Sequence, residues 1–216
     1  MKKRSGKSGK AGKAPRARRN SSRRSASLIP NAVFLVGFMG AGKTTVGQTL
    51  AARLNWLFED LDHRIERREK RTVPEIFREL GEPAFREAEH AALRQVLEEM
   101  RGGVARVVAL GGGAFAQKAN VELLESAGVP TVFLDAPVDE LWRRCCIQAS
   151  QTGAGRPLLQ SVEQFNKLYE ARHQTYSRAS HKVSTHERTV EDIAIEIAKK
   201  LKLRKMTVHI EEGDTE

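Results

Sequence analysis

Short apolar runs alternate with helix-period stretches from Leu28 onward. This alternation is typical of buried parallel strands connected by crossover helices. The apolar runs that predict strands are 32–36, 56–59, 104–110, 130–134 and 182–185. The stretches that predict helices are 44–54, 62–70, 73–80, 83–100, 121–126, 138–146, 162–178 and 190–203. Residues 148–157 carry Gly153 and Gly155 and are expected to form a flexible loop. The sequence therefore predicts one α/β domain, over residues 28–205.

The two ends of the chain differ in composition from this domain. Residues 1–27 hold 11 of the 37 Lys and Arg and none of the 27 Asp and Glu, so the remainder carries a formal charge of −1 although the whole chain carries +10. A tract of Lys, Arg, Gly, Ala and Ser buries too little apolar surface to fold, and residues 1–27 are expected to be a disordered basic tail. A solvated tail is favoured over weak electrostatic contact with RNA, and an organelle transit peptide is a third reading. Residues 206–216 are expected to be a flexible acidic tail.

The cysteines and the apolar runs bear on the compartment. Cys145 and Cys146 are adjacent, which offers neither a disulfide framework nor metal-ligand spacing. The sequence has no run of 18 apolar residues and no apolar core of a secretory signal near its start. We therefore expect a cytoplasmic protein that does not contact a membrane.

A phosphate-binding loop is the clearest motif. Gly37, Gly42, Lys43 and Thr44 fit the pattern G-x-x-x-x-G-K-[ST] between an apolar strand and an amphipathic helix, the context that the motif requires. Glycines let backbone N–H groups converge on phosphate oxygens at a helix N-terminus, where the helix dipole also favours negative charge. The lysine would neutralise the β- and γ-phosphates, and the threonine hydroxyl would ligate Mg²⁺. The motif predicts a nucleotide site, which ATPases, GTPases and small-molecule kinases all use.

Residues that could bind the substrate that accepts the phosphoryl group lie at the ends of two other predicted strands. Asp60 and Asp62 have period-two spacing at a strand's carboxyl end, where open α/β sheets bind ligands. One carboxylate could steer Mg²⁺ through water and the other accept a hydroxyl proton, although Asp62 could equally be a helix cap and Asp60 a solvated charge. Gly111, Gly112 and Gly113 end the strand 104–110 and would leave backbone N–H groups open to a ligand.

Three arginines are candidates for binding anions. Arg86 and Arg172 lie in predicted helices, where either could clamp a carboxylate bidentately or form a surface salt bridge. Arg156 precedes Pro157 in the predicted loop, where a mobile cation could close over the transferring phosphate or remain an exposed charge.

Taken together, these segments resemble the shikimate kinase family from residue 31 to residue 203. The matching segments, in family order, are GFMGAGKTTVG from Gly37, Asp60-Leu61-Asp62, Phe85 to Glu89, Leu110 to Gly113, Arg156 to Leu159, and Tyr169 to Arg172. The resemblance implies a nucleoside-monophosphate-kinase-like fold: three layers, with a five-stranded parallel sheet, helices on both faces and a mobile lid at about 147–162. The tails and residues 145–155 depart from the family pattern.

The resemblance also implies a reaction and roles for individual residues. The reaction is transfer of the ATP γ-phosphate to the 3-hydroxyl of shikimate, a step toward chorismate and the aromatic amino acids. Asp62, Arg86, Gly112, Gly113 and Arg172 would bind shikimate. Lys43, Asp62 and Arg156 would be catalytic. Thr44 would hold Mg²⁺, with Asp60 acting through water. ATP would be bound by Gly40, Ala41, Gly42, Lys43, Thr44, Thr45, Arg144, Arg156 and Arg188, with Arg144 packing against adenine. The protein is expected to be a monomer with ATP and shikimate as its partners.

Two other functions remain open at this point. A gluconate-type sugar-acid kinase would use the same loop, but the paired Asp, two arginines and three glycines favour shikimate. A kinase-like regulatory or ligand-binding module would keep the pocket and lose a catalytic position, whereas Lys43, Asp62, Arg86, Arg156 and Arg172 are all present.

Overall fold

A five-stranded parallel sheet forms the centre of the domain in the computed structural model, which describes residues 32–152 and 161–206. Its strands are β1 (Ala32–Val36), β2 (Leu57–Asp60), β3 (Arg106–Ala109), β4 (Thr131–Asp135) and β5 (His181–Ser184). They lie in the order β2-β3-β1-β4-β5, and every neighbouring pair is parallel. The predicted α/β fold with five parallel strands is confirmed.

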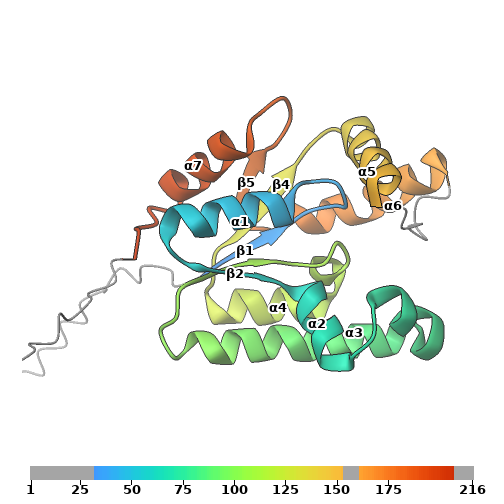
Figure 1. The fold of residues 1–216 in the computed structure, drawn as a ribbon, viewed down its shortest axis with the longest axis horizontal. Helices are drawn as coiled ribbons and strands as arrows, with labels where there is room; N and C mark the ends of the chain where they lie inside the picture. The colour runs from blue at the N-terminus through green and yellow to red at the C-terminus, as the bar shows by residue number, and fades with distance from the viewer. Residues whose placement is uncertain (1–31, 153–160, 207–216) are drawn as a thin grey trace, which may run out of the picture.

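Helices cover both faces of this sheet (Figure 1). They are α1 (Lys43–Leu54), α2 (Leu61–Glu69), α3 (Val73–Met100), α4 (Lys118–Ala127), α5 (Val138–Thr152), α6 (Val162–Tyr176) and α7 (Val190–Lys200), with a short 3-10 helix η1 at Ala114–Ala116. In Figure 1, α1 and α7 lie on one side of the sheet and α3 and α4 on the other. The three-layer arrangement predicted from the sequence is confirmed.

The apolar content of β1 explains its central place. All five of its residues are buried, as expected for a strand covered on both faces, and it pairs with β3 on one side and β4 on the other. The carboxyl ends of β1, β2 and β3 therefore lie side by side, and each is followed by one of the candidate site segments.

The helix that contains Gly81 is continuous in outline but broken at that residue. Gly81 has φ 81° and ψ 169°, which is not helical, so the predicted end at Gly81 and new start at Pro83 are confirmed inside α3. The first half begins with a capping box, in which the Thr72 side chain accepts from Glu75 N and the Glu75 carboxylate accepts from Thr72 N. The break changes the direction of the chain just before Arg86.

Two local predictions are wrong. The helix expected to end near Cys146 extends to Thr152, so the loop expected from residue 148 is helical up to that point. The physical reason is that no glycine or proline interrupts the segment before Gly153. The rest of the expected loop, residues 153–160, lies outside the described residues. The lid expected at about 147–162 stays a prediction.

The other correction concerns the cap of α2. Asp60, not Asp62, is the cap: its carboxylate accepts a hydrogen bond from Asp62 N at 3.0 Å. The Asp62 side chain is thereby left for another role.

The described chain ends against the C-terminal end of α1. Met206, expected to begin the acidic tail, donates its N–H to the Leu54 carbonyl at 2.8 Å, and its own carbonyl accepts from Asn55 Nδ2 at 3.2 Å. The basic tail and residues 207–216 lie outside the described residues. Among the helices of the described ranges, none is long and apolar enough to cross a membrane.

Candidate active site

The phosphate-binding loop connects β1 to α1. Gly42 is the N-cap of α1 in the left-handed conformation (φ 86°), and no side chain caps the helix, so its first N–H groups face the loop. Lys43 folds back over the loop, and its Nζ donates to the carbonyls of Gly37 and Phe38, both at 2.9 Å. The loop therefore combines a helix N-terminus and an ammonium group at one point.

Gly40, at the centre of the phosphate-binding loop, has little room for a side chain. Its φ is 80°, and a Cβ placed there would lie 2.7 Å from the Leu141 carbonyl oxygen and 3.0 Å from Cys145 Sγ. The start of α5 thus packs directly on the loop, which accounts for the glycine at this position.

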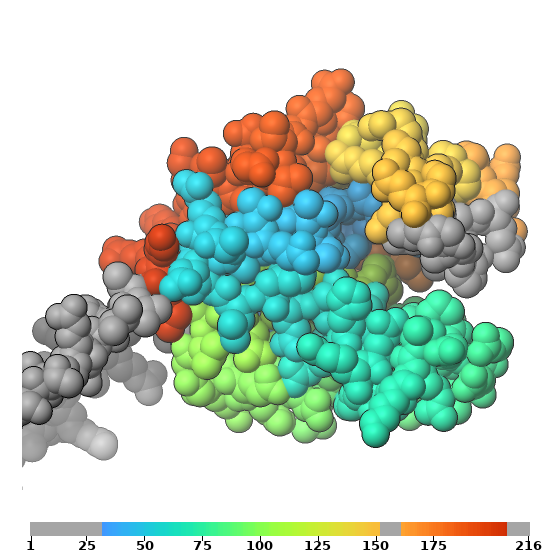
Figure 2. Space-filling view, viewed as in Figure 1, coloured from blue at the N-terminus to red at the C-terminus, as the bar shows by residue number. Residues whose placement is uncertain are grey.

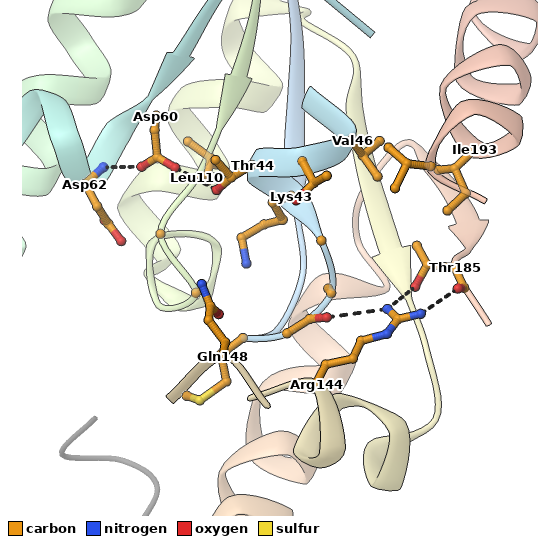
Figure 3. Close-up of a pocket in the computed structure, with 18 of the residues that line it drawn as sticks. Lys43, Thr44, Val46, Asp60, Asp62, Leu110, Arg144, Gln148, Thr185 and Ile193 are labelled. Atoms are coloured by element: carbon orange, nitrogen blue, oxygen red, sulfur yellow. Dashed lines mark hydrogen bonds between the residues drawn. The ribbon is translucent and has the colours of Figure 1, made fainter. Parts of the chain in front are cut away.

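Asp60 connects the phosphate-binding loop to α2. Its Oδ2 accepts from the Thr44 hydroxyl at 2.9 Å, while its Oδ1 caps α2 through Asp62 N (Figure 3). Hydroxyl and carboxylate oxygens are the ligand types that Mg²⁺ prefers, and it commonly keeps several waters and takes substrate phosphates. In the described ranges no three His, Cys, Asp or Glu residues gather as a dedicated metal cluster. Thr44 and Asp60 therefore fit a magnesium ion that is completed by water and phosphate.

Asp62 lies beside this pair as a partly buried carboxylate. Burial, and after it the neighbouring Asp60 charge, raise the pKa of its carboxyl to about 6, against the lowering effect of Lys43. Its Oδ1 is buried, and no group of the described residues donates a hydrogen bond to it. Near neutral pH the ionised carboxylate can only accept hydrogen bonds. A substrate hydroxyl placed at this oxygen would therefore donate its hydrogen bond to the carboxylate.

A cavity of about 550 Å³ brings these groups together. Its lining residues are Met39 to Val46, Asp60, Asp62, Leu110, Gly111, Gly112, Arg144, Gln148, Thr185, Arg188, Val190 and Ile193. The carboxyl ends of β1, β2 and β3 all contribute, as the parallel sheet predicts. In the space-filling view the α2–α3 region lies below this end of the sheet and α5 above it (Figure 2).

Two glycines after β3 lie directly against side chains of the site. A Cβ on Gly111 would lie 2.4 Å from Asp62 Oδ1, and a Cβ on Gly113 would lie 2.6 Å from Arg86 Nη1. Around Gly112 there is room, since the nearest protein atom to a Cβ there is Met39 N at 3.8 Å. The glycine loop is thus the floor on which both Asp62 and Arg86 rest.

The Arg86 guanidinium is held by its own helix. It donates to Glu82 Oε1 at 2.8 Å and to Glu89 Oε2 at 3.0 Å, and its Cζ lies 5.2 Å from the Phe85 ring centre. Glu89 is fully buried, and burial raises the pKa of its carboxyl to about 7, against the lowering effect of Arg86. Arg86 therefore stands in a fixed orientation against Gly113.

Arg172 reaches the same loop from α6. Its Nη1 donates to the Gly112 carbonyl at 3.2 Å, and the hydroxyl of Tyr176, one turn later on α6, donates to the same carbonyl. The two arginines thus meet at neighbouring glycines although they are 86 residues apart in the chain.

A third helix fixes the far end of the glycine loop. Asn120 at the start of α4 is buried, and its Nδ2 donates to the Ala114 carbonyl at 3.0 Å. Its Oδ1 accepts from His90 Nδ1 at 2.7 Å. His90 follows Glu89 on α3, so the same helix supports the loop at Gly113 and, through Asn120, at Ala114.

Arg144 and Arg188 line the other end of the cavity. Arg144 donates to the Gly40 carbonyl at 3.4 Å, to Thr185 Oγ1 at 3.1 Å and to the Thr185 carbonyl at 2.8 Å, as Figure 3 shows. Arg188 donates to the Ser184 carbonyl at 3.2 Å and pairs with Glu196. Both arginines border the cavity near the phosphate-binding loop, and their place beside a nucleotide base stays a prediction.

The structure thus gathers all but one of the predicted site residues. Lys43, Asp60, Asp62, Gly112, Arg144 and Arg188 line one cavity together with Gly40, Ala41, Gly42, Thr44 and Thr45, and Arg86, Gly113 and Arg172 adjoin it through the glycine loop. Arg156 lies outside the described residues, so its position remains a prediction.

Three residues of this arrangement were not predicted: Glu89, Asn120 and Tyr176. Helical spacing places Glu89 beside Arg86 and Tyr176 beside Arg172, so these two had a signal in the sequence. Asn120 had none, because its partners come from the 3-10 helix η1 and from α3.

A phosphate-binding loop on a five-stranded parallel sheet, with carboxylates and guanidinium groups at the adjoining strand ends, defines the class of P-loop phosphotransferases. The sequence model of the family described as shikimate kinase matches residues 39–202. The chain therefore belongs to the shikimate kinase family, a family of ATP-dependent phosphotransferases, and the resemblance seen in the sequence is confirmed.

Individual relatives agree with this assignment. A shikimate kinase from Cereibacter sphaeroides is 40% identical over 86% of this chain and 90% of its own length. One from Thermus thermophilus is 41% identical over 78% and 89%, respectively. Among solved structures, the shikimate kinase from Acinetobacter baumannii in complex with shikimate matches with a TM-score of 0.71 and 35% identity, over 80% of this chain and 93% of that one.

Proposed function

We propose that this protein transfers the γ-phosphate of ATP to the 3-hydroxyl of shikimate, giving shikimate 3-phosphate and ADP, on the route to chorismate and the aromatic amino acids. The observation that carries the proposal is the position of Asp62, a partly buried carboxylate that shares one cavity with Lys43 and rests on the same glycine loop as two arginines. The relative from Acinetobacter baumannii, which was solved with shikimate, supports the choice of acceptor.

The acceptor's carboxylate is assigned to the two arginines. Arg86 lies against Gly113 and Arg172 is bonded to Gly112, so two guanidinium groups border the same loop. A planar guanidinium matches a carboxylate with two parallel hydrogen bonds, which fixes the orientation of a rigid ring as well as binding it. The backbone of Gly112 and Gly113 would contact the bound ring where no side chain intervenes.

Asp62 is assigned to the reacting hydroxyl. Its Oδ1 would accept the hydrogen bond of the 3-hydroxyl and take its proton as the hydroxyl oxygen bonds to the γ-phosphorus. The bond from that phosphorus to the β,γ-bridging oxygen breaks, and ADP leaves with its electron pair. Because burial raises the pKa of Asp62 to about 6, the carboxylate is charged at neutral pH and basic enough to share a proton.

Stabilisation of the negative charge on the transferring phosphoryl group is assigned to Lys43 and Arg156. Lys43 Nζ now contacts the carbonyls of Gly37 and Phe38, and a bound nucleotide would exchange those contacts for phosphate oxygens. Magnesium held by Thr44, with Asp60 acting through water, would supply charge neutralisation at the phosphates. Arg144 and Arg188 would border the adenine, and Gly40 to Thr45 would surround the phosphates.

The test is ADP release measured with Mg-ATP and either shikimate or gluconate. Release that depends on shikimate and is absent with gluconate supports the proposal. Turnover of gluconate alone would establish a sugar-acid kinase, and shikimate binding without ADP release would indicate a ligand-binding module. A monomeric state and a cytoplasmic location stay predictions, which light scattering and cell fractionation would test.

A further inference from the structure

The carbonyl of Gly112 accepts hydrogen bonds from two side chains of one helix. Arg172 Nη1 donates to it at 3.2 Å, and the Tyr176 hydroxyl donates to it as well. The two residues are four apart on α6, which places their side chains one above the other on the same face. One carbonyl thus has a cationic donor and a neutral donor.

The position of the Tyr176 hydroxyl is fixed by its surroundings. The side chain is fully buried, and its ring packs on Phe133 with the ring centres 5.4 Å apart. Burial raises the pKa of its hydroxyl to about 12, so the group keeps its proton and remains a donor at any working pH. Arg172, by contrast, is partly exposed at the end of a long side chain with five N–H donors.

We propose that Tyr176 is a positioning residue for the acceptor: it keeps the Gly112 carbonyl hydrogen-bonded when Arg172 leaves that carbonyl for the carboxylate of shikimate. This inference rests on the proposed function, in which Arg172 binds that carboxylate. Without the tyrosine hydroxyl, Arg172 could move to the carboxylate of shikimate only by leaving the Gly112 carbonyl, which the bound shikimate covers, without a hydrogen-bond donor. An unpaired buried carbonyl opposes binding, so the hydroxyl favours release of the arginine.

The experiment compares the Tyr176→Phe enzyme with the wild type. The KM for shikimate is expected to rise roughly 5- to 150-fold, the range for leaving one buried polar group unpaired, with kcat and the KM for ATP within about twofold of wild type. Tyr169→Phe, which removes the other tyrosine hydroxyl of the same helix, should leave the shikimate KM near its wild-type value. Thermal unfolding of each variant checks that the domain folds.

Two further arms separate positioning from general support of the loop. The Tyr176→Phe effect should be much smaller with the methyl ester of shikimate, which lacks the charged carboxylate, and it should disappear in an Arg172→Ala background, where no arginine has to be released. An equal effect on shikimate and its ester, or an additive effect with Arg172→Ala, overturns the inference while leaving the proposed function standing.

Failure of the proposed function gives a different result. In that case the wild-type enzyme would release no ADP in response to shikimate, or Arg172→Ala would leave the shikimate KM unchanged. Either outcome overturns the role of Arg172 and, with it, the positioning role of Tyr176.

Discussion

Replacing Gly111 with alanine tests whether the glycine loop positions the catalytic carboxylate. The added Cβ would lie 2.4 Å from Asp62 Oδ1, 3.2 Å from its Cγ and 3.3 Å from its Oδ2. Gly111 does not have a positive φ, so alanine is compatible with its backbone and the contact with Asp62 is the whole perturbation.

The expected loss follows from these distances. Ordinary contacts of a Cβ begin near 3.4 Å, so the carboxylate or the loop must move by about 1 Å. A displacement of that size at a reacting group costs on the order of 100-fold in rate. We therefore expect kcat to fall about 100-fold, while the KM for ATP changes little because Lys43 and Thr44 are on a different loop.

The assay is steady-state ADP release with shikimate, with Gly112→Ala as the comparison. A Cβ on Gly112 meets its nearest protein atom, Met39 N, at 3.8 Å, so Asp62 should keep its position even if the acceptor binds less tightly. A Gly111→Ala enzyme with near-normal kcat would refute the idea that Asp62 is held against this loop. A loss of kcat that is equally large in Gly112→Ala would show that any side chain in the loop is harmful.

The remaining predictions concern single groups of the site and one tail. Lys43→Ala should lower kcat by at least about 100-fold in the same assay, because one preorganised phosphate contact is worth that much; near-normal kcat would show that the loop lysine is not catalytic. Burial raises the folded pKa of Asp62 from 3.8 to about 6, so the stability that its protonated form contributes is present below pH 3.8 and is lost as the pH rises through about 6. Asp62→Asn should therefore abolish turnover yet raise unfolding stability by on the order of 2–3 kcal/mol at pH 8 and by little at pH 3.5, measured by urea unfolding; an equal change at both pH values would contradict the shift. For the wild type, kcat/KM should rise with pH through about 6 if Asp62 is the base, and a flat acidic limb would exclude it. Asn120→Ala should lower stability by about 2–4 kcal/mol, because it leaves the Ala114 carbonyl and His90 without their partner, whereas the exposed Glu122→Gln should change it by less than about 0.5 kcal/mol. Deleting residues 1–27 should leave kcat unchanged at moderate salt, and a large drop would assign the basic tail a role in turnover.

The sequence went far toward the fold because its local signals agree with one another. The apolar runs of β1, β3 and β4 have no alternation, which is what burial on both faces of a parallel sheet requires, and helix-period stretches separate them. Gly81 and Pro83 marked a real break inside α3. The predicted end of α5 was wrong because Gly153 and Gly155 favoured a loop that began at residue 148. Residues 147–152 contain no glycine or proline, so the helix continues through them.

For the site, the sequence identified the chemistry of most groups but not their supports. Motif spacing indicated Lys43 and Asp62, and the resemblance to the shikimate kinase family assigned Arg86 and Arg172 to the site. It could not show that Gly111 lies against Asp62 or that Asn120 holds Ala114, because those contacts join segments from different strands and helices. Asp62 was weighed as a helix cap, and only the observed bond from its own N–H to Asp60 excludes that reading.

The sequence by itself therefore determined the class of fold, the phosphate-binding loop and the types of group that face the acceptor, since periodicity and motif spacing are properties of the chain alone. The tertiary structure decided which of those groups share a cavity, which carbonyl Arg172 and Tyr176 share, and why the pKa of Asp62 is raised. These features depend on burial and on the order β2-β3-β1-β4-β5, which brings distant strand ends to one edge of the sheet and is not written in any single segment.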